Sequence, residues 1–67
     1  MNFYSVYIDN GLDYEDYTDR RYIIIATSEK EAEEIAKELW LEWYEMDGKN
    51  VTAKLMTKSD NGIPLNI

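Results

Sequence analysis

The segment 28–47, with the sequence SEKEAEEIAKELWLEWYEMD, constrains the fold more than any other part of the chain. It contains no Gly or Pro and is rich in Ala, Leu, Glu and Lys, which favour helices. Ser28 and Glu31 have the spacing of a capping box, in which Ser28 accepts from the first turn and Glu31 reaches back to the Ser28 N–H. Gly48 can adopt the left-handed conformation that ends a helix. The segment is therefore predicted to form one helix from Ser28 to Asp47.

The predicted helix has an apolar side and an acidic side. At 100° per residue, apolar residues form a seam that is flanked by Trp40 and Tyr44, while Leu41 points the opposite way. Five glutamates gather on another side, in a row roughly 21 Å long. The seam consists of Ala32, Ile35, Ala36, Leu39, Trp43 and Met46, and the row consists of Glu31, Glu34, Glu38, Glu42 and Glu45. We expect Trp43 to lie in the core and Trp40 to be half-buried at its rim.

Three other segments have the composition of β-strands. Residues 3–9 and 50–58 alternate between apolar and polar side chains, which predicts strands with one buried face. Residues 20–27 have an isoleucine centre, which predicts a strand that is either buried on both faces or apolar on an exposed one. Pro64 interrupts the alternation of residues 63–67, so that segment is expected either to add a short edge strand or to lie on the core.

The element order β-β-α-β predicts an α+β fold for residues 1–67 as a single domain, with one helix packed on a three- to four-stranded mixed sheet. A right-handed crossover should make the second and third strands parallel. The first strand can lie between them, as in a split β-α-β unit. One helix covers only one face of the sheet, so the other face is a candidate surface for self-association or a partner. Its apolar side chains are expected to come from Phe3, Tyr7, Tyr22 or Ile23, Ile25 and Met56.

The side-chain inventory argues against an enzyme. The chain has no Cys and no His, so it lacks the usual general base, the thiol nucleophile and the ligands of a thiolate zinc site. The carboxylates of residues 9–19 are numerous enough to bind calcium, but their spacing does not match an EF-hand loop. We therefore expect no catalytic residue, no cofactor and no metal. The N-terminus lacks a secretion signal and no apolar run has membrane-spanning length, so a cytoplasmic location is expected.

Negative charge is the strongest functional signal in the chain. The 14 acidic and 7 basic residues give a net charge of −7, and thirteen of the acids lie in residues 9–19 and 28–47. Such a surface repels nucleic acid and attracts basic protein surfaces. Arg20 and Arg21 are expected to neutralise the neighbouring loop. The candidate partner-binding residues are Asp13, Tyr14, Glu15, Asp16, Tyr17 and Asp19 in the loop, together with the glutamate row of the helix. The two blocks act together only if they lie on one surface.

With its short length, strong acidity, many tyrosines and lack of Cys, the chain resembles small proteins that bacteriophages and mobile elements encode against host defences. These include anti-CRISPR proteins and DNA mimics. The resemblance is one of type over the whole chain, and it rests most on the stretches LDYEDYTD and SEKEAEEIAKELWLEWYE. It implies an inhibitor that binds the basic nucleic-acid-binding surface of a host defence enzyme, such as a CRISPR nuclease or a restriction enzyme, and blocks nucleic-acid access.

Two other interpretations of the same residues remain open. A run of charge is commonly a solvated face that keeps a protein dissolved. The chain is alternatively a small protein-interaction or dimerisation module that uses the open sheet face and has no inhibitory role.

Overall fold

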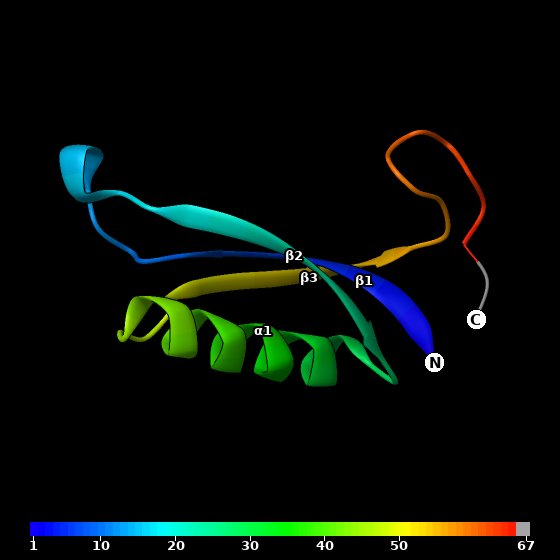
Figure 1. Cartoon of the computed structure of the whole chain (residues 1–67), viewed down its shortest axis with the longest axis horizontal. Coiled ribbons are helices and arrows are strands. Elements are labelled where there is room, and N and C mark those ends of the chain that lie inside the picture. Colours follow the sequence, from blue (N-terminus) through cyan, green and yellow to red (C-terminus); the bar gives the residue numbers. More distant parts are fainter. Residues whose placement is uncertain (66–67) are drawn as a thin grey trace.

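The structure is a computed structural model that describes residues 1–65 (Figure 1). In chain order it contains β1 (Asn2–Asp9), the short 3-10 helix η1 (Tyr14–Asp16), β2 (Asp19–Ala26), α1 (Glu29–Tyr44) and β3 (Asn50–Met56). The three strands form one sheet, and α1 covers one of its faces (Figure 1). The predicted α+β fold with the order β-β-α-β is confirmed, and each strand agrees with its predicted range to within two residues at either end.

β1 is the central strand, and it pairs antiparallel with both of its neighbours. Val6 marks the middle of the register, opposite Tyr22 of β2 and Ala53 of β3. β2 and β3 therefore run in the same direction on either side of β1, as expected for a split β-α-β unit. Because β1 separates them, every hydrogen-bonded pair is antiparallel, which corrects the expectation of a mixed sheet.

The segment after β3 forms a turn rather than a strand over the residues that the structure describes. Lys58 and Pro64 make a single antiparallel bridge, and the Ser59 N–H donates to the Ile63 carbonyl at 2.8 Å inside it. Two residues of the predicted fourth strand, 66 and 67, lie outside the described range.

The core lies between the sheet and α1. Alternate residues of each strand face the helix, and small alanines on α1 let its backbone approach the sheet closely. The buried apolar side chains are Tyr4, Val6, Ile8, Ile24, Ala26, Ala32, Ala36, Trp40 and Ala53.

α1 begins where the sequence predicts and ends earlier. Ser28 caps it, since its Oγ accepts from the Glu31 N–H at 3.1 Å. The Glu31 carboxylate reaches back to Thr27 instead of Ser28, accepting from the Thr27 N–H at 3.1 Å and from its hydroxyl at 3.0 Å. Glu45 takes a left-handed conformation with φ 56° and its N–H donates to the Leu41 carbonyl at 2.8 Å. The helix therefore ends at Tyr44, and the predicted end at Asp47 is wrong.

Gly48 is needed for close packing and not for ending the helix. A Cβ at this position would lie 2.7 Å from Ile8 Cγ1 and 3.3 Å from Trp40 Cδ1. Both neighbours are fully buried. The chain that follows α1 thus passes directly over the core, where only a residue without a side chain fits.

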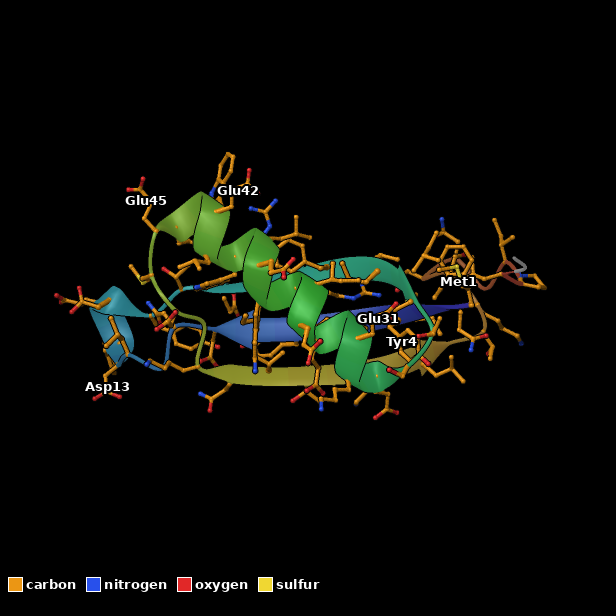
Figure 2. All side chains as sticks on the ribbon, turned by 90° about the horizontal axis from the view of Figure 1, so that it is seen from below. Met1, Tyr4, Asp13, Glu31, Glu42 and Glu45 are labelled. Carbon is orange, nitrogen blue, oxygen red and sulfur yellow. The ribbon has the colours of Figure 1, made fainter. Side chains whose placement is uncertain are left out.

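The predicted burial of both tryptophans is wrong, because Trp40 and not Trp43 lies in the core. Trp40 is fully buried and packs on Tyr44 with ring centroids 4.1 Å apart, whereas Trp43 is 71% exposed. The buried positions of α1 follow an i, i+4 row, which is inclined to the helix axis and suits a helix that crosses its neighbours at an angle. Figure 2 shows this oblique crossing of α1 over the strands. The outer part of the predicted seam, Leu39, Trp43 and Met46, is consequently exposed.

Candidate partner-binding surface

The glutamate row lies on the side of α1 that faces away from the sheet. At 100° per residue, Glu34, Glu38 and Glu42 point roughly opposite to the buried Ala36 and Trp40, and all three glutamates are exposed. We call Glu34, Glu38 and Glu42 the acidic ridge. These three residues occupy successive i, i+4 positions, so their carboxylates are about 6 Å apart along the axis.

The two ends of the predicted row have other roles. Glu31 is half-buried and its carboxylate is held by Thr27, as described above. Glu45 lies beyond the last helical residue. The helical part of the row, from Glu31 to Glu42, rises by about 16 Å, which is shorter than the predicted row.

The carboxylates of the acidic ridge form no ion pair within residues 1–65, although Arg20 lines one depression together with Glu42. Across residues 1–65, the only ion pair within 4.0 Å joins Arg21 to Asp60, far from the ridge in sequence. Like charges four residues apart destabilise an isolated helix by about 0.2–0.5 kcal/mol per pair. The fold therefore tolerates a repulsive surface here, and that surface is open to a cationic partner.

The acidic loop between β1 and β2 is held in place by two buried polar side chains. The Asn10 amide donates to the Asp16 carbonyl at 2.6 Å and accepts from the Leu12 and Thr18 N–H groups at 3.1 and 3.2 Å. The Asp9 carboxylate accepts from the Gly11 N–H at 2.8 Å. Asp9 therefore contributes to loop structure and not to an exposed acidic surface.

The predicted site residues of the loop fall into two groups. Asp19 is the first residue of β2, and Tyr17 is held beside it by Tyr7, whose hydroxyl donates to Asp19 Oδ2 at 2.8 Å and bonds to the Tyr17 hydroxyl. These bonds, first that to Tyr17 and then that to Asp19, raise the pKa of Tyr7. All six side chains are exposed, and the side chains of the other four make no hydrogen bond in the described residues: Asp13, Tyr14, Glu15 and Asp16. In residues 1–65 no three acidic side chains gather closely enough to hold a metal ion.

The structure does not bring the loop acids and the acidic ridge onto one surface. In Figure 1 the η1 segment lies on the opposite side of the sheet from α1. In Figure 2, seen from the helix side, Asp13 lies well apart from Glu42 and Glu45 at the same end of the molecule. Since the ridge points away from the sheet, the two acidic blocks face different directions, and each would meet a partner by itself.

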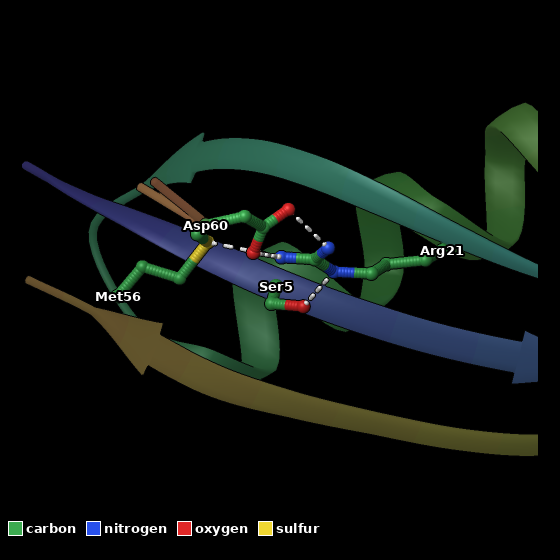
Figure 3. A network of polar contacts seen from close by, with 4 residues as sticks. All are labelled: Ser5, Arg21, Met56 and Asp60. Atoms are coloured by element: carbon green, nitrogen blue, oxygen red, sulfur yellow. Dashed lines mark hydrogen bonds and ion pairs between the residues drawn. The ribbon is translucent and has the colours of Figure 1, made fainter. Parts of the chain in front are cut away.

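Neither arginine of β2 neutralises the loop, which corrects the prediction. Arg21 lies across the open face, where its Nε donates to Ser5 Oγ at 2.6 Å and its two terminal nitrogens donate to the Asp60 carboxylate at 2.9 and 3.0 Å (Figure 3). The hydrogen bond from Arg21 lowers the pKa of Asp60. Arg20 stacks on the helix side, 5.2 Å from the Tyr22 ring centroid and 5.5 Å from that of Trp43.

The open sheet face exposes two isoleucines of β2. Ile23 and Ile25 are 51% and 49% exposed, which agrees with a strand whose second face is apolar and unburied. Tyr22 lies on the helix face instead, because it is opposite the buried Val6. Phe3 and Met56 are half-buried beside them.

Sequence reasoning missed a depression beside β2 on the helix face. It has a volume of about 270 Å³ and is lined by Arg20, Tyr22, Leu39, Glu42 and Trp43. The depression was not predicted because the sequence pattern assigned Trp43, one of its lining residues, to the core. The signal that could have revealed it is the i, i+4 spacing of Ala32, Ala36 and Trp40, which alone defines a narrower buried stripe.

Comparison of the chain with protein-family models, curated proteins and solved structures finds no match. In the part of the chain that the structure describes, no helix is long and apolar enough to cross a membrane.

Proposed function

We propose that this protein is an acidic inhibitor that binds, through the acidic ridge of α1, the basic nucleic-acid-binding surface of a host defence enzyme and blocks nucleic-acid access. The observation that carries this proposal is the exposure of Glu34, Glu38 and Glu42 on one side of the helix, where none of them forms an ion pair within 4.0 Å in the described residues. A regular row of anionic oxygens suits arginines and lysines that otherwise hold phosphates.

The ridge is organised before it binds. Trp40 anchors α1 in the core and Ser28 caps its first turn, so the backbone that carries the carboxylates is already ordered. Binding then requires no ordering of the backbone that carries the ridge, which favours affinity. The net charge of −7 adds long-range attraction to a basic surface.

The test is inhibition of nucleic-acid cleavage by a panel of CRISPR nucleases and restriction enzymes. We expect the chain to inhibit at least one enzyme of the panel, with inhibition that weakens as salt is raised, since exposed charges are screened. The triple variant Glu34→Lys, Glu38→Lys and Glu42→Lys should lose this inhibition. Circular dichroism checks that it still folds.

The loop provides a matched control for this variant. Asp13→Lys, Glu15→Lys and Asp16→Lys together change the net charge by the same six units, from −7 to −1, but on the opposite side of the sheet. Inhibition should survive in this second variant. If the ridge variant inhibits as well as the unmodified chain, or if both variants fail equally, the ridge is not the binding surface.

A second candidate function is a protein-interaction module that uses the sheet. The half-exposed Ile23 and Ile25 favour it, since apolar side chains on an open face are candidates for burial against a partner. Binding of this kind would persist at high salt, which separates it from binding through the ridge.

A further inference from the structure

The outer edge of β2 is suited to pairing with another strand. β2 and β3 are the two edge strands of the sheet, and within residues 1–65 no strand pairs with the outer side of β2. β3 has Lys54 near its middle, and a charged lysine is a common protection of an edge. From Tyr22 to Thr27, by contrast, the chain has no charged residue.

The register shows which backbone groups of β2 point outward. The Asn10 N–H donates to the Thr18 carbonyl at 3.0 Å, and this pair continues the β1–β2 register. Since hydrogen-bonded and non-hydrogen-bonded pairs alternate in an antiparallel ladder, the N–H and C=O groups of Tyr22 and Ile24 point to β1. Those of Arg21, Ile23 and Ile25 point outward.

Apolar side chains flank this edge on both faces of the sheet. Ile23 and Ile25 are half-exposed on the open face. On the helix face, the exposed Trp43 and Leu39 stand beside the depression described above. A strand added to β2 would therefore be contacted above and below as well as along its backbone.

We propose that two copies of this chain pair through β2, antiparallel and with Ile23 opposite Ile23 of the second copy, to form one six-stranded sheet. In this register Arg21 lies opposite Ile25 of the second copy, so every outward N–H and C=O from Arg21 to Ile25 finds a partner. No like charges lie directly opposite each other, and both open faces lie on the same side of the sheet.

Charge complementarity favours a second copy of this chain as the partner that pairs with the β2 edge. In the proposed register Arg20 lies opposite Ala26 of the second copy, two residues before the cap of its α1. The first turn of that helix carries Glu29 and Glu31. Residues 19–21 at the start of each β2 carry a net charge of +1 and lie near residues 29–31 of the other α1, which carry −1, whereas two chains of charge −7 repel each other elsewhere.

The two helices also fit on the shared face. α1 packs across the sheet, whose central strand is β1, so the distance between the two β1 strands approximates the distance between the two helices. The β1 strands would be three strand spacings apart, about 14 Å, which exceeds the 8–10 Å between helices in direct contact. The large side chains of Trp43 and Leu39 stand on this side of α1, and Figure 2 shows the C-terminal end of α1 on the β2 side of the sheet. They would fill the space between the helices.

The test is the mass in solution, measured by light scattering over a range of protein concentrations at low and high salt. We expect two copies of the 7.9 kDa chain. Ile23→Lys places two like charges opposite each other and should weaken association about tenfold or more. The matched control is Leu55→Lys, at a strand position that is 52% exposed on β3, and it should leave association unchanged.

Mixing experiments test the register itself. Residue 23 lies opposite itself only in the proposed pairing, so Ile23→Lys and Ile23→Glu variants should each associate about tenfold or more weakly than the unmodified chain, and mixing them should restore the dimer. A mixture that stays monomeric, or a dimer that Ile23→Lys does not weaken, overturns the proposal. A wild-type chain that stays a monomer also overturns it and leaves the β2 edge to a strand from another protein. This inference does not depend on the proposed function, because Ile23 is on the opposite side of the sheet from the acidic ridge.

Discussion

Truncating the two tryptophans of α1 should have very different effects on stability. A chain of 67 residues has a free energy of unfolding of roughly 3–10 kcal/mol. Trp40 is fully buried between α1 and the sheet, so Trp40→Ala should cost about 3–5 kcal/mol and remove most of that stability. Trp43 is 71% exposed and its main described contact is with Arg20 at 5.5 Å. Trp43→Ala should therefore cost about 1 kcal/mol or less.

Urea unfolding followed by far-ultraviolet circular dichroism measures both costs. Acrylamide quenching of tryptophan fluorescence gives an independent measurement, because Trp43 should be quenched readily and Trp40 should be protected. The reasoning is refuted if Trp43→Ala destabilises the chain as much as Trp40→Ala does. That result would mean that α1 is rotated about its axis, with the seam of the sequence prediction packed against the sheet.

Two further predictions concern Gly48 and Tyr7. Gly48→Ala should destabilise the fold by about 1–3 kcal/mol, seen as a lower melting temperature, because its methyl group would overlap fully buried core atoms. The pKa of Tyr7 is raised above its ordinary value of 10.0 by its bonds to Tyr17 and Asp19, so the folded state holds this proton more tightly than the unfolded state. That contribution to stability is complete below pH 10.0 and is lost as pH rises further. In urea unfolding at rising pH, Tyr7→Phe should lose less stability above that pH than the unmodified chain.

Local patterns were sufficient to predict the elements and their order. The alternation of β1 places Tyr4, Val6 and Ile8 in the core, and the capping residue Ser28 marks the start of α1, as the structure confirms. These features depend on neighbours in the chain, so they can be identified from sequence alone.

The register of α1 against the sheet could not be predicted in the same way. A helical projection assumes that the buried stripe runs along the axis, and on that assumption Trp43 belongs to the core. The oblique crossing of α1 moves the stripe to Ala32, Ala36 and Trp40. The predicted end of the helix was wrong for a related reason. Gly48 is needed because a side chain at this position would overlap Ile8, a residue that is distant in the sequence.

Charge counting overstated the functional surface, because several acids have structural roles. Asp9 holds the loop, Asp19 accepts from Tyr7, Glu31 completes the cap of α1 and Asp60 pairs with Arg21. None of these bonds can be identified from composition, since each one depends on long-range placement or on the geometry of a turn.

Two groups of exposed acids without a described structural role, the acidic ridge and the acids of the β1–β2 loop, lie apart, and this separation determines the shape of a target that could bind them. The acidic ridge lies on the helix side and faces away from the sheet. Asp13, Glu15 and Asp16 lie on the opposite side of the sheet. A single copy therefore offers a basic partner one row of three carboxylates, a small number against the charge of a nucleic acid. The proposed β2 pairing would place two such rows on one face, above two β1 strands that lie about 14 Å apart. If both proposals hold, the target carries two basic strips at that separation, and Ile23→Lys should weaken inhibition although it leaves every ridge carboxylate in place.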